Sequence, residues 1–318
     1  MNQDPFSHIL TLVNARSVVA GGFSAGGDWA IAFPPPDRVK FFIAARGACW
    51  LAMEGGDAPI RLREGDVFLM AAARAFTLAS DLSLPAQNAR HLFAHVSRKI
   101  INIGVGDEFL FLGGHVQLDS AGGQLLINNL PPAIHLRAGR AEATALQWLI
   151  DQLVHEHSSG LPGSDFASAQ LAQLMFLQIL RGYLATTDAL MAGRLRAISD
   201  PRIAPAIRLM HDDPAQARHL ADLAQACAMS RTAFAIYFKS VAGVAPLTYL
   251  TQWRMHLAER TLREGNASLA TLAASLGYSS ESAFSIAFKR VTGRAPKHYR
   301  SVMRKASGQP DPGPAAGI

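Results

Sequence analysis

Histidines and cysteines are the side chains of this sequence with the chemistry to bind a metal or form a disulfide. His91 and His95, in RHLFAH, stand four residues apart, a spacing that puts both rings on one face of a helix. The HEH stretch at 155–157 lacks the spacing of a zinc-protease helix. Cys49 and Cys227 form no CxxC pair and no disulfide framework, and apolar neighbours indicate free, buried thiols. Because isolated histidine pairs are more often structural than ligating, we expect no metal, no cofactor and no catalytic residues.

Two groups of residues near the carboxyl end have the types and spacing to contact nucleic acid. The first group is Arg231, Thr232, Ala235, Ile236 and Lys239, and the second is Glu281, Ser282, Ser285, Ile286, Lys289 and Arg290. For any single member, a solvated helix face is as good an interpretation as a base contact. Lys239, Lys289, Arg290 and the basic residues between 294 and 305 are expected to neutralise phosphates, which gives affinity without sequence choice.

A duplicated segment positions these two groups. Residues 219–250 and 268–300 repeat each other with a one-residue insertion, including paired phenylalanines at 234 and 238 and at 284 and 288. Each copy predicts a short Ala/Leu helix, a turn ending in a capping serine (Ser230 or Ser280), and a second helix that buries its phenylalanines. A glycine, Gly243 or Gly293, ends that helix. Two short helices joined by a tight turn form the helix-turn-helix pattern, whose second helix enters the DNA major groove.

A longer helix is predicted between the copies, from Pro246 to Glu264. Proline at its first position and Gly265 after its end are typical helix boundaries. Its length of roughly 27 Å suits two recognition helices placed about one duplex turn, or 34 Å, apart. One polypeptide is thus expected to read two successive major grooves on one face of the DNA.

Charge is distributed unevenly along the chain, whose formal net charge is +6. Residues 1–200 contain 15 Lys or Arg and 17 Asp or Glu, whereas residues 201–305 contain 15 Lys or Arg and only 6 Asp or Glu. A basic segment beside a nearly neutral one favours an anionic partner for the basic part, although a basic surface kept for solubility explains charge alone equally well. With the repeat, it predicts double-stranded DNA as the partner.

The rest of the chain has the pattern of a β-rich domain followed by helices. Short apolar runs between Gly, Pro and Asp breakers fill residues 17–135, a spacing typical of a sandwich or barrel, after a short helix within 1–15. Residues 140–190 predict two amphipathic helices that either cover the β-domain or form a dimer contact. Residues 196–205 predict a linker, and 306–318, rich in Pro, Gly and Ala, a disordered tail. No signal peptide or membrane-spanning run is evident, so we expect a cytoplasmic protein without a membrane partner.

The GYSSESAFSIAFKRVTGRAPKHYR stretch closely resembles the signature of the AraC/XylS family of transcription regulators. More loosely, residues 5–190 resemble the cupin-type N-terminal domain of one AraC subgroup, in SVVAGGFSAGGDWAIAFP, KFFIAARGACWL, REGDVFLM, LINNLPPAIHL and LPGSDFASAQLAQLMFLQILRGYLA. The resemblance implies an α+β multidomain protein: an N-terminal cupin-like β-barrel with covering helices, and a C-terminal all-α domain of two helix-turn-helix units. The corresponding domains are 1–138 (sensor), 139–200 (helical dimerisation and linker region) and 201–305 (DNA binding), before the tail.

Two features depart from the resembled families. Members of the AraC family often carry arginine late in each recognition helix, where this chain has Ile236 and Ile286; isoleucine can contact a thymine methyl but cannot bind guanine bidentately. Direct readout then falls to Thr232, Ser282 and Ser285, or to DNA shape. Cupin enzymes hold a metal with histidines at places that correspond here to Phe42 and Phe76.

These observations predict a sequence-specific DNA-binding regulator with an effector-sensing, dimerising N-terminal domain. The resemblance implies activation, a homodimer, an unknown small-molecule effector and RNA polymerase as a further partner. A cupin-type metalloenzyme with a helical appendage needs a His/Glu triad that residues 40–95 lack. The other alternative is an effector-independent architectural DNA-binding protein, but in such a protein the β-rich domain would have no role. Some members of the subgroup sense oxidants through cysteines, and redox sensing stays a minor alternative for Cys49 and Cys227.

Overall fold

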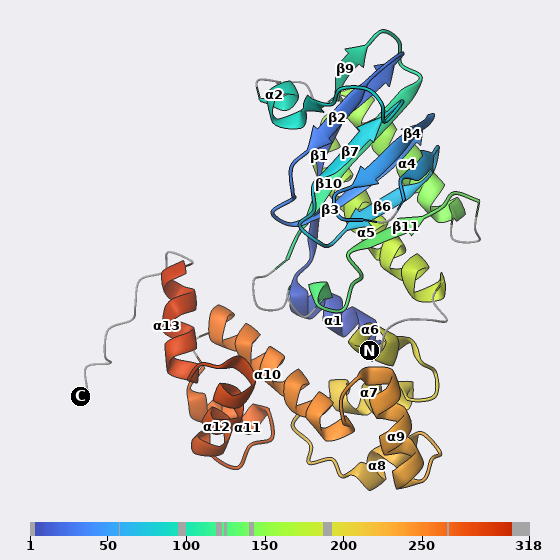
Figure 1. The fold of residues 1–318 in the computed structure, drawn as a ribbon. Helices are drawn as coiled ribbons and strands as arrows, with labels where there is room; N and C mark the ends of the chain where they lie inside the picture. The colour runs from blue at the N-terminus through green and yellow to red at the C-terminus, as the bar shows by residue number, and fades with distance from the viewer. Residues whose placement is uncertain are drawn as a thin grey trace. The chain divides into compact units, whose positions relative to one another are not determined.

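Short strands occupy most of the chain between residues 16 and 136 in the computed structural model, as the Gly- and Pro-rich breaks predict (Figure 1). The structure describes residues 4–56, 58–94, 100–118, 123, 126–139, 143–186, 193–265 and 267–306. One sheet has the order β11-β6-β3-β10-β1-β9, and its strands are β1 (Arg16–Gly26), β3 (Val39–Arg46), β6 (Val67–Met70), β9 (Ile100–Gly104), β10 (Phe109–Gln117) and β11 (Ala133–Leu136). The other has the order β5-β4-β7-β2-β8, and its strands are β2 (Ala30–Phe33), β4 (Ala48–Met53), β5 (Ile60–Arg63), β7 (Phe76–Ala79) and β8 (Gln87–Asn88). The short helix α2 (Ala89–Phe93) follows β8.

The inward faces of the two sheets meet in one apolar core. Phe23, Phe42 and Phe111 from the first sheet pack with Leu51 and Phe76 from the second, all of them buried. Because successive strand residues point to opposite faces, the alternating apolar positions of each strand supply this core. Burial of each large side chain contributes about 1.5–3 kcal/mol. The predicted cupin-like β-domain is confirmed.

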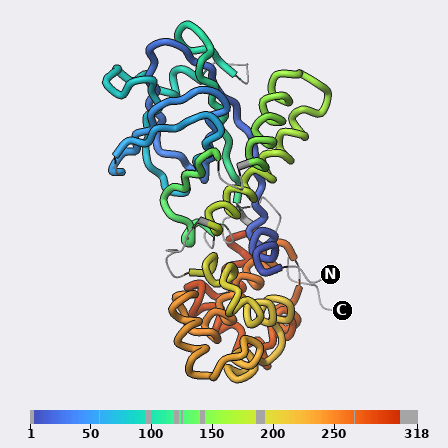
Figure 2. Tube along the Cα trace, turned by 90° about the vertical axis from the view of Figure 1, so that its right-hand side faces the viewer, coloured from blue at the N-terminus to red at the C-terminus, as the bar shows by residue number. Residues whose placement is uncertain are grey.

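Two helices, α4 (Ala143–Ser159) and α5 (Ser164–Thr186), cover the outer face of the first sheet. Helix α5 packs along β1 and β11, and α4 packs on β3, which is why β3 is buried on both faces through Phe41 and Ile43 as well as Phe42. Figure 2 shows this yellow-green hairpin on one side of the strands. Of the two roles left open by the sequence, covering the β-domain is the one observed.

The C-terminal helices form a second compact unit with two apolar cores. They are α6 (Arg194–Ser199), α7 (Ala204–Asp212), α8 (Leu220–Ala226), α9 (Arg231–Ala242), α10 (Pro246–Glu264), α11 (Leu269–Ser275), α12 (Glu281–Thr292) and α13 (Pro296–Ala306). Residues 194–199, expected with the preceding helices, instead belong here because Leu195 and Ala197 are buried in this unit. The predicted tail beyond Ala306 lies outside the described residues.

The N-terminal helix α1 (Pro5–Val13) has the predicted helical structure but groups with the C-terminal unit rather than with the β-domain that follows it. It begins at Asp4, whose side chain accepts hydrogen bonds from two backbone N–H groups, and packs on α6, α7 and α10. Ile9, Leu12 and Val13 are its buried apolar residues. The first described residues of the expected sensor domain (1–138), up to Asn14, therefore belong to the C-terminal unit and not to the β-domain.

Among the described residues, no single helix is long and apolar enough to cross a membrane. Helices α9 and α10 pass that test only as a pair bent by 50°.

Candidate nucleic-acid interface

The first two-helix unit consists of α8, a short turn and α9. The Oγ of Ser230 accepts a hydrogen bond from the backbone N–H of Ala233 at 3.2 Å, which caps α9 as predicted. Phe234 and Phe238 are fully buried with ring centroids 5.5 Å apart, so the inward face of α9 is core. The opposite face leaves exposed Arg231, Thr232, Ile236 and Lys239, with Ala235 half-buried.

The second unit, α11 and α12, repeats this construction. Ser280 caps α12 through a 3.1 Å hydrogen bond from the Ala283 backbone N–H, and the buried rings of Phe284 and Phe288 lie 5.7 Å apart. The outward residues Glu281, Ser282, Ile286, Lys289 and Arg290 are exposed, and Ser285 is half-buried. Each predicted contact residue therefore reaches solvent at least in part, and none belongs to either core.

The turn between the two helices of each unit needs a left-handed residue at the same place. Ala228 has φ 54° in the first unit and Gly277 has φ 75° in the second. Left-handed backbone is strained for alanine but not for glycine. A Cβ on Gly277 would lie 2.0 Å from the backbone oxygen of Ala215, so the second turn also packs closely on the loop before α8.

Helix α10 spans Pro246–Glu264 as predicted and belongs to both cores. Its first half buries Tyr249 and Leu250 against α9, and its second half buries Met255 and Leu262 against the second unit. A continuous helix that contributes buried residues to both cores fixes one unit with respect to the other.

Arg254 is a positioning residue that the sequence interpretation missed. Its guanidinium donates hydrogen bonds to the backbone oxygens of Pro214 (2.6 Å) and Gln216 (3.0 Å), and it lies 5.7 Å from the ring centre of Tyr278. The contacts join the loop before the first unit to the turn of the second. Burial lowers the pKa of Arg254. Its partners lie 40 and 38 residues before it and 24 residues after it, so no local pattern marks it.

Comparisons with known proteins agree with this arrangement. Residues 4–185 match the Cupin family and residues 223–301 match the helix-turn-helix domain family. A putative AraC-like transcription regulator of Streptomyces antibioticus is 41% identical over 279 residues, covering 88% of this chain and 92% of the relative. The RCS-specific HTH-type transcriptional activator RclR of Escherichia coli is 26% identical, covering 95% of this chain and 99% of RclR. The chain belongs to the AraC-like transcription regulators.

A solved structure with similarity to the C-terminal part of this AraC-like regulator is the DNA-binding domain of AdpA, a global transcriptional factor, in complex with a target DNA. It is 28% identical, covers 35% of this chain and 100% of that chain, and has a TM-score of 0.33. Together, the family membership and the duplicated helix-turn-helix units establish a DNA-binding transcription regulator, with DNA as its partner.

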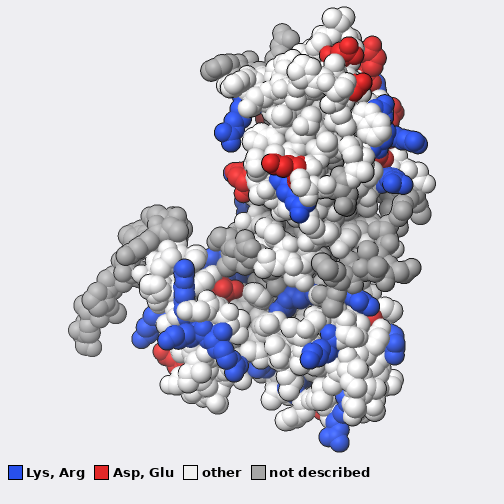
Figure 3. Space-filling model, viewed as in Figure 1, with Lys and Arg blue, Asp and Glu red and all other residues white. Residues whose placement is uncertain are grey.

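Basic side chains gather on the C-terminal unit of the AraC-like regulator. Figure 3 shows Lys and Arg over its helices with few acidic groups among them. Glu281 is an acidic member of the predicted contact set, in the first turn of α12. There it is favoured by the positive end of the helix dipole, and its carboxylate has the acceptor chemistry to pair with the N4 amino group of cytosine.

The β-domain of the AraC-like regulator does not fit the metal site of cupin enzymes. Phe42 and Phe76, where the family resemblance leads us to expect the metal-binding positions, are buried with ring centroids 4.7 Å apart, and neither side chain has a ligating atom. Within the described ranges, no three His, Cys, Asp or Glu side chains are grouped as metal ligands. His91 is exposed, and His95, its proposed partner, lies outside the described residues.

Both cysteines are free thiols, as predicted, but only Cys49 is buried as expected. Cys49 is fully buried, and burial raises its pKa to about 12 although Arg61 opposes this shift. Half-buried Cys227 also has a raised pKa, chiefly through burial. A raised pKa leaves little thiolate at neutral pH, so both thiols are poor nucleophiles.

Proposed function

We propose that this regulator reads two successive major grooves with the outward faces of α9 and α12. The observation that carries the proposal is a pair of isoleucines at equivalent positions: Ile236 is 68% exposed and Ile286 is 71% exposed. An apolar side chain left in solvent at the same place in both copies has a use if it contacts a thymine methyl group. Thr232, Ser282 and Ser285 then supply hydrogen bonds to bases, with Arg231, Ala235 and Glu281 beside them.

Lys239, Lys289 and Arg290 supply phosphate contacts in this proposal. All three are exposed in the last turns of their helices, where cations are also favoured by the helix dipole. Phosphate contacts set the register of the protein on the duplex, and base contacts choose the sequence.

The N-terminal domain, in the same proposal, senses a small molecule and joins two copies of the chain. Exposed apolar residues on the hairpin support a homodimer through that surface: Trp148 in α4, and Phe166 and Leu174 in α5. Trp148 and Leu174 stand at similar sequence distances from the α4–α5 turn, so one surface can contain both. A Leu174→Ser variant that stays dimeric in analytical ultracentrifugation contradicts this part.

The regulator acts, we infer, as a cytoplasmic activator that contacts RNA polymerase, and not as an enzyme. Activation is the usual mode of the family it belongs to, and the E. coli relative is named an activator. Phe42 and Phe76 have no atom that can bind a metal, and this favours a sensor role for the domain over the role of a catalytic cupin. Functionally, 1–138 is the sensor, 139–200 the dimerisation and linker region, and 201–305 the DNA-binding domain.

DNA footprinting on sites selected from genomic DNA tests the proposal. Ile286→Ala is expected to weaken binding to the selected site by about tenfold, with little change on random DNA, because only base contacts are removed. Leu247→Ala is the matched control, since Leu247 is an exposed apolar residue of α10 outside the recognition helices. Unchanged affinity and unchanged site choice in both Ile286→Ala and Lys289→Ala contradict a reading role for α12.

A further inference from the structure

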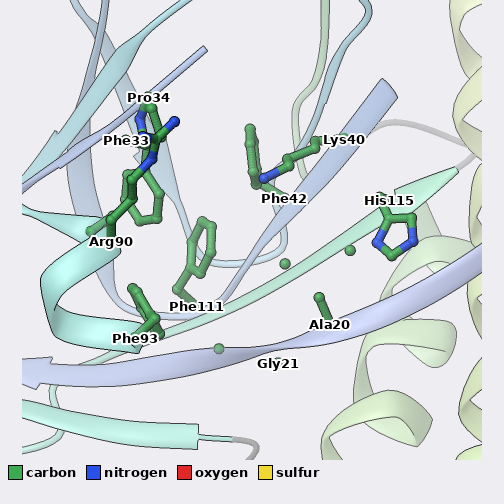
Figure 4. Close-up of a pocket in the computed structure, with 14 residues that line it drawn as sticks. Ala20, Gly21, Phe33, Pro34, Lys40, Phe42, Arg90, Phe93, Phe111 and His115 are labelled. Atoms are coloured by element: carbon green, nitrogen blue, oxygen red, sulfur yellow. The ribbon is translucent and has the colours of Figure 1, made fainter. Parts of the chain in front are cut away.

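A pocket of about 400 Å³ opens between the sheets of the β-domain (Figure 4). Its volume lies within the roughly 300–1,000 Å³ range of small-molecule sites. Strands β1, β2, β3 and β10 and helix α2 supply its walls, so the pocket lies wholly within one compact unit.

A missing side chain on β10 helps to leave this space open, because a Cβ on Gly113 would lie 3.1 Å from the ring of Phe111, another lining residue. Gly21, Gly22, Gly113 and Gly114 line the pocket at the place where the β1–β10 register shifts, between Val19 and Gly21. A bulge of this kind redirects side chains and often lies next to a functional site. At Gly114, a Cβ would lie 2.2 Å from the ring of Phe41 on the far face of the sheet, so the glycine lets the covering layer pack closely behind the pocket.

The walls carry aromatic rings and two basic side chains, and Figure 4 shows Arg90 at the same end as Phe33. Figure 4 shows Phe33, Phe93 and Phe111 at one end and His115 at the other, with the side chain of Lys40 between them beside Phe42. Aromatic walls favour a flat apolar ligand, because rings stack on one another with a gain beyond simple burial.

Positive charge is the second property of the pocket. Lys40 and Arg90 line it, and none of its lining residues within the described ranges is acidic. Over the described part of the chain, neither of these two cations has a carboxylate within ion-pair distance. The pKa of His115 is lowered, first by burial and then by the charges of Arg38 and Lys40, against a smaller opposing effect of Asp37. Two cations beside apolar walls favour a ligand that is both apolar and negatively charged.

We infer that this pocket binds a compact aromatic molecule carrying one anionic group, such as an arene carboxylate. The rings of Phe33, Phe42 and Phe111 hold the apolar body, and Lys40 and Arg90 hold the carboxylate by charge-assisted hydrogen bonds. The inference rests on the proposed sensing role of the N-terminal domain and names the chemical class of its effector.

Calorimetric titration of the full chain with 2-naphthoate and with its neutral isostere 2-naphthamide tests the charge requirement without any mutation. The carboxylate is expected to bind at least about tenfold more tightly than the amide, because a hydrogen bond to a charged group is the stronger kind. Equal affinity of the two compounds, or no saturable binding of 2-naphthoate at millimolar concentration, overturns the inference.

Variants test the location. Lys40→Gln and Arg90→Gln are each expected to weaken 2-naphthoate binding by on the order of tenfold, whereas Arg46→Gln, an exposed β3 cation outside the pocket, leaves it unchanged. Ala20→Trp, which fills the pocket from β1, is expected to abolish binding of both compounds. Undiminished binding to Ala20→Trp overturns the location. Since Arg90 and Ala20 are exposed, their variants keep the test valid if Lys40→Gln fails to fold.

Gel-shift titration of the same preparations on the selected DNA site separates this inference from the proposed function. If the unmutated chain binds the selected DNA site but not 2-naphthoate, the pocket assignment alone is refuted. Tight 2-naphthoate binding in a protein that does not choose a DNA site supports the pocket and refutes the groove-reading proposal.

Discussion

The imidazole of His211, at the end of α7, lies flat against the indole of Trp253 in α10, with ring centroids 3.8 Å apart and an angle of 6° between the planes. The Nε2 of the same histidine is 3.0 Å from the hydroxyl of Tyr249, and His8 of the N-terminal helix lies 5.7 Å away. This buried contact joins α1 and α7 to the helix that both helix-turn-helix units share.

Acid is expected to destabilise the C-terminal unit through His211. Burial, followed by the charges of His8 and Arg194, lowers the pKa of His211 from 6.5 to about 3. Between those two values the unfolded chain binds the proton and the folded one does not, so stability present above pH 6.5 is lost as pH falls toward 3. From pH 7.5 to 5.5 the free energy of unfolding is expected to fall by about 1 kcal/mol from this group alone.

Urea unfolding followed by far-UV circular dichroism measures this effect. The difference in free energy of unfolding between the two pH values is expected to shrink by about 1 kcal/mol in His211→Gln. It is expected to persist in His298→Gln, which removes an exposed histidine of α13. An unchanged pH difference in His211→Gln would show that His211 is not the responsible group.

Turn residues are expected to respond in opposite directions in the two units. Ala228→Gly relieves a left-handed alanine and should raise stability by about 0.5 kcal/mol. Gly277→Ala adds strain at φ 75° and a Cβ 2.0 Å from the Ala215 oxygen, and should lower stability by roughly 2 kcal/mol or more. Gly293→Ala, with φ 74° and nothing near its Cβ, measures the strain without the clash. If both variants lose the same free energy of unfolding, the contact between residue 277 and the Ala215 oxygen does not contribute to the loss.

Inward and outward residues of α12 are expected to separate stability from DNA binding. Phe284→Ala empties a fully buried site and should lower the free energy of unfolding by about 3–5 kcal/mol. Ile286→Ala, two positions along the same helix, should change it by less than about 0.5 kcal/mol while weakening specific DNA binding. Thermal melts and gel shifts on both variants check the division, and a large loss of stability in Ile286→Ala would argue that this residue packs in the fold.

Phosphate contacts are expected to appear in the salt dependence of DNA binding. Removing one contact by Lys239→Gln or Lys289→Gln should reduce the slope of log K against log salt by about 0.9. Arg208→Gln on α7 is the matched control, because Arg208 is exposed outside the recognition helices. If the slope is the same in both lysine variants as in the unmutated protein, Lys239 and Lys289 do not contact phosphates.

Thiol labelling is expected to distinguish the two cysteines. Cys49, buried and with a pKa raised to about 12, should react with an aromatic disulfide reagent only as fast as the β-domain unfolds. Half-buried Cys227 should react sooner in the native protein. Single Cys→Ala variants identify each signal, and rapid native labelling of Cys49 would contradict the buried assignment.

Local spacing in the sequence was enough to determine the duplicated units. The capping serines 230 and 280, the phenylalanine pairs, and the glycine and proline boundaries of α10 act within one or two helical turns, so their effect is visible without a fold. The resemblance of the β-rich half also predicted its class, since strand alternation and turn residues are local as well.

Only the tertiary structure decided which distant residues meet. The placement of α1 with the C-terminal unit, the contacts of Arg254 with residues before α8, the stacking of His211 on Trp253, and the pocket between Lys40 and Arg90 join segments far apart in the chain. Apolar helix faces such as that of α1 are compatible with several partners, and burial selects among them only when all the surfaces are present at once.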